Sequence, residues 1–155
     1  MKLQEFVILY RRDLTRLKKE ISAYLTEESL WAKLPGTINS GGNICQHLIG
    51  NLRTYIGLQI GEVPYVRDRD AEFNSRLFTR EQLLKEIDFL LQVIPESILK
   101  MNENQLAEEY PHDVVDIHNE QSFGFILMHL YQHLAWHTGQ INYHRRIVDH
   151  EKSVY

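Results

Sequence analysis

Hydrophobic residues recur at helical spacing in four long stretches of the chain. In the first stretch, residues 2–26, the apolar positions follow one another in alternating steps of four and three; they are Leu3, Val7, Tyr10, Leu14, Leu17, Ile21 and Tyr24. Charged residues lie off this line, so the spacing predicts one long amphipathic helix. Thr26, followed by two glutamates and Ser29, is typical of the N-cap of a further short helical turn.

A second helix is predicted from the region Ser40–Asn43 to about Gln59. Its apolar side is formed by Ile44, Leu48, Leu52 and Tyr55. Residues 61–78 then combine many charges with no clear period, which predicts a long connection from one end of the helices to the other. Within it, the charged segment Arg67–Phe73 is most simply interpreted as a solvated loop.

A third helix is predicted from Thr79 to about Met101. Thr79 and Gln82 form a capping-box pattern, and apolar residues at helical spacing follow them. Pro95 lies inside this stretch. Because proline lacks the backbone N–H and clashes with the preceding turn, we expect it to kink the helix or split it into two pieces.

The fourth helix is predicted to begin near Gln121 or Ser122 and to run to about Asp149. Residues 102–121, which precede it, are polar and rich in turn-forming residues. The brief alternation at residues 113–117 is a weak strand signal. Four long helices joined by two long connections predict an all-α fold, a four-helix bundle with long crossover connections.

Composition agrees with a single helical domain over residues 1–155. The chain is 43% hydrophobic and 25% charged, and its net charge is −4, which argues against a basic nucleic-acid surface. The sequence shows no run long and apolar enough to span a bilayer and no signal-peptide pattern, so no membrane association is expected. Cys45 is the single cysteine, which excludes an intrachain disulfide and makes a cytoplasmic location the simplest interpretation.

The fourth helix carries an unusual set of histidines. His129, His133 and His137 are spaced at i, i+4 and i+8, which places them within about 80° of one another on one helical face. Gln140 and His144 fall on the same face. Imidazole is a common ligand of zinc, nickel, copper and iron, so this face predicts a transition-metal site.

A third ligand would have to come from another helix, and His47 is the only histidine on the predicted second one. Three histidines leave a coordination position open, as a catalytic metal requires. Spacing alone does not choose between His129/His133 and His133/His137 as the ligand pair. The alternative interpretation is that these histidines are packed, hydrogen-bonded residues without a metal.

Three motifs resemble the DinB/YfiT-like superfamily of metal-binding four-helix bundles. The segment His133–Ile141 resembles the H-x-x-x-H-x-G-Q-I signature of its last helix, and Gln46–Leu52 resembles a motif of its second helix. Arg67–Phe73 is similar to a loop in a DinB-like branch of unknown function. The motifs occur in the expected order and cover the chain from about residue 40 to 145.

The resemblance implies a metal site made by His47, His133 and His137, with zinc or nickel as the usual ion. It makes His129 a neighbour of the ligands instead of a ligand. His129, Asn51 and Gln140 would then orient the ligand imidazoles, and the regions of Arg53 and Arg67 are candidate substrate contacts. It also implies frequent homodimers.

Known relatives suggest a divalent-metal-dependent enzyme that acts on a small molecule, as a transferase that uses a low-molecular-weight thiol or as a hydrolase. Two other hypotheses follow from the same residues. One is a non-catalytic helical module whose histidines bind a metal for stability or sensing. The other is a dimerisation domain without a metal.

Overall fold

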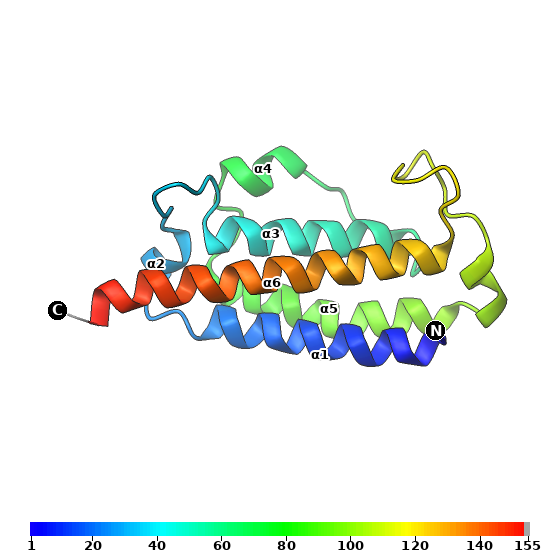
Figure 1. The fold of residues 1–155 in the computed structure, drawn as a ribbon, viewed down its shortest axis with the longest axis horizontal. Helices are drawn as coiled ribbons and strands as arrows, with labels where there is room; N and C mark the ends of the chain where they lie inside the picture. The colour runs from blue at the N-terminus through cyan, green and yellow to red at the C-terminus, as the bar shows by residue number, and fades with distance from the viewer. Residues whose placement is uncertain (154–155) are drawn as a thin grey trace.

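The computed structural model describes the backbone of residues 1–153 and the side chains of residues 1–150; residues 154 and 155 of the predicted domain lie outside this range. The described chain is all-α, as predicted, and contains no strand. Its α-helices are α1 (Leu3–Ser22), α2 (Glu27–Trp31), α3 (Gly41–Leu52), α4 (Arg69–Asn74), α5 (Arg80–Lys100) and α6 (Phe123–Ser153). The long helices α1, α3, α5 and α6 lie lengthwise against one another (Figure 1).

Helix α1 packs against α5 and α6 and buries the predicted line of apolar residues from Leu3 to Ile21; Tyr24, the last of the line, is buried just beyond the helix. Tyr10 at the centre of this line is fully buried, and its hydroxyl donates to the carbonyl of Leu127 on α6 (2.7 Å). The helix ends at Ser22, before the predicted residue 26, because Thr26 takes the extended backbone of an N-cap. Its side chain accepts from the Ser29 amide at the start of α2, so the short capped turn is confirmed.

Helix α3 is buried on every side, although it carries several polar residues. Ser40 caps it by accepting from the Asn43 amide (3.1 Å), as the sequence suggests. The predicted helix to Gln59 continues beyond α3 as a π-helical segment, Arg53–Leu58. Polar side chains on a fully buried helix need partners from a neighbouring element, and α4 supplies them.

Three details differ from the sequence-based expectations. The connection 61–78 contains the helix α4, which begins where Asp68 accepts from the Ala71 amide. The sequence predicted a kink or a split at Pro95, and the split does not occur, because helix α5 runs without a break through this buried residue. Proline removes only one intrahelical bond, and the apolar residues on both sides of it stay packed in the core. Residues 113–117 form no strand: the first two belong to a turn, and the others are irregular.

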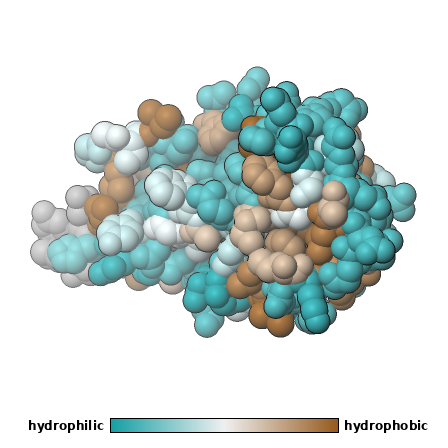
Figure 2. Space-filling model, turned by 45° about the vertical axis from the view of Figure 1, so that its right-hand side comes forward, coloured by the Kyte–Doolittle hydropathy of each residue, from teal (hydrophilic) through white to brown (hydrophobic). Residues whose placement is uncertain are grey.

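The surface is mostly hydrophilic on the face shown in Figure 2, with hydrophobic residues gathered in a few patches. None of the helices in the described range 1–153 has the length and apolar character needed to cross a membrane.

His144 ties α6 to the chain around α2. Its Nε2 donates to the carbonyl of Ala32 (2.8 Å), so its Nδ1 accepts from the Tyr24 hydroxyl (2.7 Å). Gly41, at the start of α3, is in close contact with the same hydroxyl, and a Cβ there would overlap it. Both nitrogens of the neutral imidazole therefore have hydrogen-bond partners, and these bonds join α6 to the chain on either side of α2.

Burial lowers the pKa of His144 below its ordinary value of 6.5 and outweighs the Ala32 carbonyl and Asp149, which raise it. Between that lowered pKa and 6.5, the unfolded chain binds more protons than the folded one, so stability falls as the pH falls. We expect His144→Gln to reduce the pH dependence of the free energy of unfolding by up to about 1.4 kcal/mol per pH unit. Chemical denaturation of the metal-free protein at a series of pH values below neutral measures this.

The matched control is His118→Gln, which replaces an exposed histidine and should leave the slope as in the wild type. A slope that stays the same in both variants would contradict the role given to His144.

Candidate metal centre

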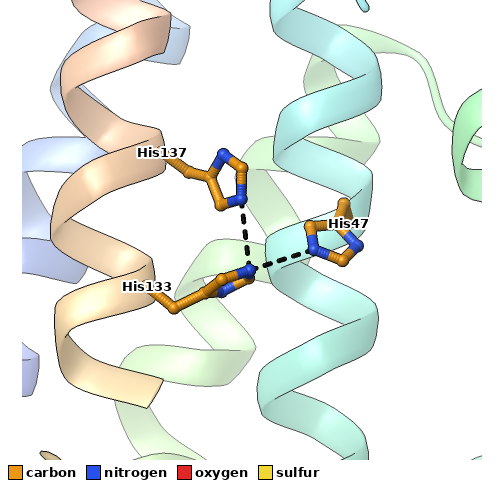
Figure 3. Close-up of side chains that lie close together, drawn as sticks. All are labelled: His47, His133 and His137. Carbon is orange, nitrogen blue, oxygen red and sulfur yellow. Dashed lines mark hydrogen bonds between the residues drawn. The ribbon is translucent and has the colours of Figure 1, made fainter. Parts of the chain in front are cut away.

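Three imidazoles converge between α3 and α6. Nε2 of His133 lies 3.1 Å from Nε2 of His47 and 3.1 Å from Nε2 of His137 (Figure 3). Each of the three residues offers one nitrogen within 4.8 Å of the others. The structure thereby brings His133 and His137 together with His47. Helical spacing alone did not choose between His129/His133 and His133/His137 as the two residues of α6.

Hydrogen bonds alone do not account for the short distances among these three nitrogens. The Nε2 of an imidazole has one in-plane orbital, which holds either a proton or a lone pair. The Nε2 of His133 faces two other Nε2 atoms at once, so it cannot form a well-directed hydrogen bond to each. A cation between the rings accepts all three lone pairs, and this is the arrangement that the donor set fits.

The separations agree with this interpretation. Zinc–nitrogen bonds of about 2.0–2.1 Å at tetrahedral angles place two ligand nitrogens about 3.3 Å apart. The two distances of 3.1 Å to His133 are close to that value. The three side chains therefore need little rearrangement to hold a divalent ion.

His47 is oriented by a carboxylate that the sequence did not single out. Its Nδ1 lies 3.0 Å from Oε2 of Glu72 on α4. A carboxylate only accepts, so Nδ1 carries the proton and Nε2 keeps its lone pair towards the other histidines. Phe73 packs against the same imidazole, with ring centroids 4.9 Å apart.

Arg67 pairs with the same carboxylate, and its Nη2 lies 3.2 Å from Nδ1 of His47. Its Nε donates to Oε1 of Glu72 (2.7 Å) and its Nη2 to Oε2 (2.9 Å), a two-pronged ion pair. Burial alone raises the pKa of Glu72, but the hydrogen bonds from His47 and Arg67 bring it below the ordinary value of 4.5. Glu72 is only 2% exposed, and it is ionised at neutral pH.

Polar side chains of α3 hold the Glu72 segment in place. The side-chain amides of Asn43 and Gln46 donate to the Glu72 carbonyl (3.1 and 2.9 Å), and Gln46 accepts from the Leu77 amide (2.6 Å). Gly50 leaves room for the carboxylate itself, because a Cβ at that position would overlap Oε1 of Glu72. The polar face of α3 thus holds the Glu72 carboxylate in place beside His47.

His137 has a partner on its own helix. Its Nδ1 lies 2.6 Å from Oε1 of Gln140, so Nδ1 donates and Nε2 again keeps its lone pair. His133 differs, because its Nδ1 is buried and has no hydrogen-bond partner among the described residues. His129 stacks on the His133 ring at a centroid distance of 6.5 Å.

Asn51 and Arg53, two further residues that the sequence analysis proposed for the site, make no hydrogen bond to the three histidines among the described residues. Asn51 is buried, and its Oδ1 has no partner within the described part of the chain; Glu72, not Asn51, bonds His47. Arg53 pairs with Glu86 (2.8 Å) and stacks over Tyr65 and Phe89, apart from the histidines. Arg53 follows His47 along the same run of helix but faces α5, where Glu86 and Phe89 lie.

The two histidines of α6 at this centre are kept neutral. Burial, followed by the nearby His137 and His47, lowers the pKa of His133 from 6.5 to about 3. Burial also lowers the pKa of His137, although the bond to Gln140 opposes this. Neutral imidazole is the form that binds metals, so His133 and His137 need not lose a proton to bind an ion at neutral pH.

A pocket of about 630 Å³ opens onto this centre. His47 and His137 line it, together with Phe73 and Gln140. His133 is not part of the lining, so the pocket reaches the three nitrogens from the side of His47 and His137. Its volume is in the range of small-molecule sites.

Glu72 is the residue of this centre that sequence reasoning missed, because the segment Arg67–Phe73 is most simply interpreted from the sequence as a solvated loop; the Arg67 region is proposed there only as a candidate substrate contact. The segment is charged and short, and it lacks the periodicity that identifies a buried helix. A signal was nevertheless present in α3, where Asn43, Gln46 and His47 follow one face of an otherwise apolar helix. Such a polar face on a buried helix requires a polar segment opposite.

The fold and the site define a class: an all-helical protein with three convergent histidines between two neighbouring helices. The chain belongs to the family described as "Protein of unknown function (DUF1572)", whose model matches residues 3–154. A comparison with curated proteins found no match.

The close approach of Glu72 to α3 can be tested at Gly50. We expect Gly50→Ala to displace the carboxylate and to destabilise the protein by about 1–3 kcal/mol, the usual cost of overpacking a buried site. Equilibrium chemical denaturation measures the change.

Gly139→Ala is the matched control, because Gly139 is also helical, and a methyl group at its Cα would meet no atom of the described chain within 4 Å. It should be neutral or stabilising by about 0.5–1 kcal/mol. Equal effects of the two substitutions would show that Gly50 does not make room for Glu72.

Proposed function

We propose that the protein binds one divalent transition-metal ion through His47, His133 and His137 and acts as a metal-dependent enzyme on a small molecule. The observation that carries this proposal is the convergence of three imidazoles, two of which have Nδ1 committed to an acceptor. Zinc and nickel are the ions that we expect, because both accept imidazole nitrogen readily.

We also propose that the fold is a four-helix bundle of the DinB/YfiT-like type. The four long helices and the motifs at Gln46–Leu52 and His133–Ile141 support it. The structure gives these motifs physical roles: Gly50 makes room for Glu72, and Gln140 accepts from His137. The homodimer, the cytoplasmic location and the absence of a nucleic-acid partner stay predictions.

A divalent ion at this centre supplies a Lewis acid, which polarises a substrate oxygen or lowers the pKa of a bound water or thiol. The chain's own residues prepare the site for it. Glu72 keeps the proton on Nδ1 of His47, and Arg67 keeps Glu72 ionised. Gln140, which lines the pocket, likewise accepts from Nδ1 of His137 and so leaves Nε2 of that ring with its lone pair.

Two reaction types fit this arrangement. One is transfer to a low-molecular-weight thiol, and the other is hydrolysis by water. A non-catalytic metal-binding module is the alternative to both. The pocket beside His47 and His137 favours an enzyme, because three protein ligands leave a position for a substrate or water.

Metal binding is tested first. We expect protein made without a histidine tag to contain or take up about one equivalent of zinc or nickel, and His47→Ala, His133→Ala and His137→Ala to lose it, because two imidazoles hold a divalent ion far less tightly than three. Elemental analysis and calorimetric titration measure the content and affinity.

His129→Ala is the control, since its ring stacks on His133 without belonging to the three convergent residues. It should keep the metal. Wild-type protein that takes up no divalent ion would refute the proposal.

The role of Glu72 gives a second test. We expect Glu72→Gln to weaken metal affinity about 10–100-fold, because partners of this kind fix the tautomer and raise the basicity of the ligand imidazole. Glu81→Gln, at an exposed carboxylate paired with Lys85, should have no effect. An affinity for zinc that is unchanged in Glu72→Gln would show that the carboxylate does not support the ligand.

A further inference from the structure

The pocket beside the three histidines has an unusual lining for a polar centre. Apart from its histidines, it is built from apolar and uncharged polar residues, and no Asp, Glu, Lys or Arg of the described chain belongs to it. Its apolar members are Leu34, Ile38, Ile44, Phe73, Tyr143 and Ile147. A charged group placed against these walls would find no ionic partner among the lining residues.

The titratable groups in contact with the centre and its lining already have partners, and Arg69 and Arg146, which stack on the rings of Phe73 and Tyr143, are not part of the lining. Arg67 and Glu72 bond each other on the side of His47 that faces α4, and neither lines the pocket. His144, at the end of the lining, uses both nitrogens on Tyr24 and Ala32. None of these groups is available to bind a carboxylate, a phosphate or an ammonium group of a ligand.

One wall of the pocket is preformed. The chain at residues 34–39 makes a tight turn in which the Thr37 amide donates to the Leu34 carbonyl (3.0 Å), and Gly36 takes the left-handed backbone that the turn requires (φ 79°). This turn and the part of α6 that carries Tyr143 and Ile147 line the same cavity. Thr37 and Asn39 add neutral hydrogen-bonding groups at its edge.

From this lining we infer that the pocket takes an uncharged, largely apolar small molecule. Under the proposed function, on which this assignment of role rests, that molecule is the substrate and its reactive polar atom lies towards His47 and His137. A peptide-like thiol with free carboxylates finds no cation in the lining. The pocket therefore favours water, or a thiol without charged groups, as the second reactant.

The test uses two kinds of probe. The first is N-phenyl-naphthylamine, an uncharged dye that becomes fluorescent in apolar surroundings, titrated into metal-free protein. The second is a pair of hydroxamates with the same zinc-binding group, benzohydroxamate and para-carboxybenzohydroxamate, titrated by calorimetry into zinc-loaded protein. We expect benzohydroxamate to bind at least about tenfold more tightly than its carboxylate analogue, because the added charge meets apolar walls that offer no cation.

The test variant is Ile147→Lys, at a lining position that is 46% exposed, so the protein is expected to fold. The lysine ammonium should weaken the binding of the dye. It should also reduce or reverse the tighter binding of benzohydroxamate relative to para-carboxybenzohydroxamate. The matched control is Ile8→Lys, at a position on α1 that is 59% exposed and outside the lining. It should behave as the wild type with every probe.

The outcomes separate this inference from the proposed function. Dye binding that is absent, or that is equal in wild type and Ile147→Lys, overturns the assignment of the pocket, as does equal affinity for the two hydroxamates. Protein that binds the dye in an Ile147-dependent way but takes up no zinc supports the apolar ligand class and refutes the metal-dependent function.

Discussion

Burying a carboxylate is costly unless donors and cations surround it, and Glu72 is buried between α3 and α4 at 2% exposure. Arg67 and His47 meet this requirement together, one as a two-pronged cation and the other as a ring N–H donor. The same contacts fix which nitrogen of His47 faces α6. The fold around α4 and the chemistry of the three histidines therefore depend on one buried acid.

Helix α3 is organised to accept that acid. It is buried on all sides, which is unusual for a helix with several amides and a histidine. Its apolar residues face the core, while Asn43 and Gln46 bond the backbone of the segment that carries Glu72. Gly50 brings the two backbones close enough for the side chain to reach His47. One face of α3 therefore packs in the core, and the opposite face positions Glu72.

The centre combines two environments that are usually separate. On the α4 side the charges are buried and paired, and on the pocket side the walls are uncharged. A divalent ion between them would keep its positive charge largely uncompensated by the protein, because its three ligands are neutral. Such an ion would polarise a bound oxygen more strongly than one with carboxylate ligands.

The sequence alone determined the long helices, their caps and the face shared by His133 and His137, because these features depend on residues within a few positions of one another. It did not determine the partner of His47, the burial of Arg67 and Glu72 or the unbroken helix at Pro95. His47 and Glu72 are 25 positions apart, and helical periodicity describes only one face of one helix. Only the packing of α4 onto α3 decides that a charged segment, which looks solvated in the sequence, lies at the centre of the site.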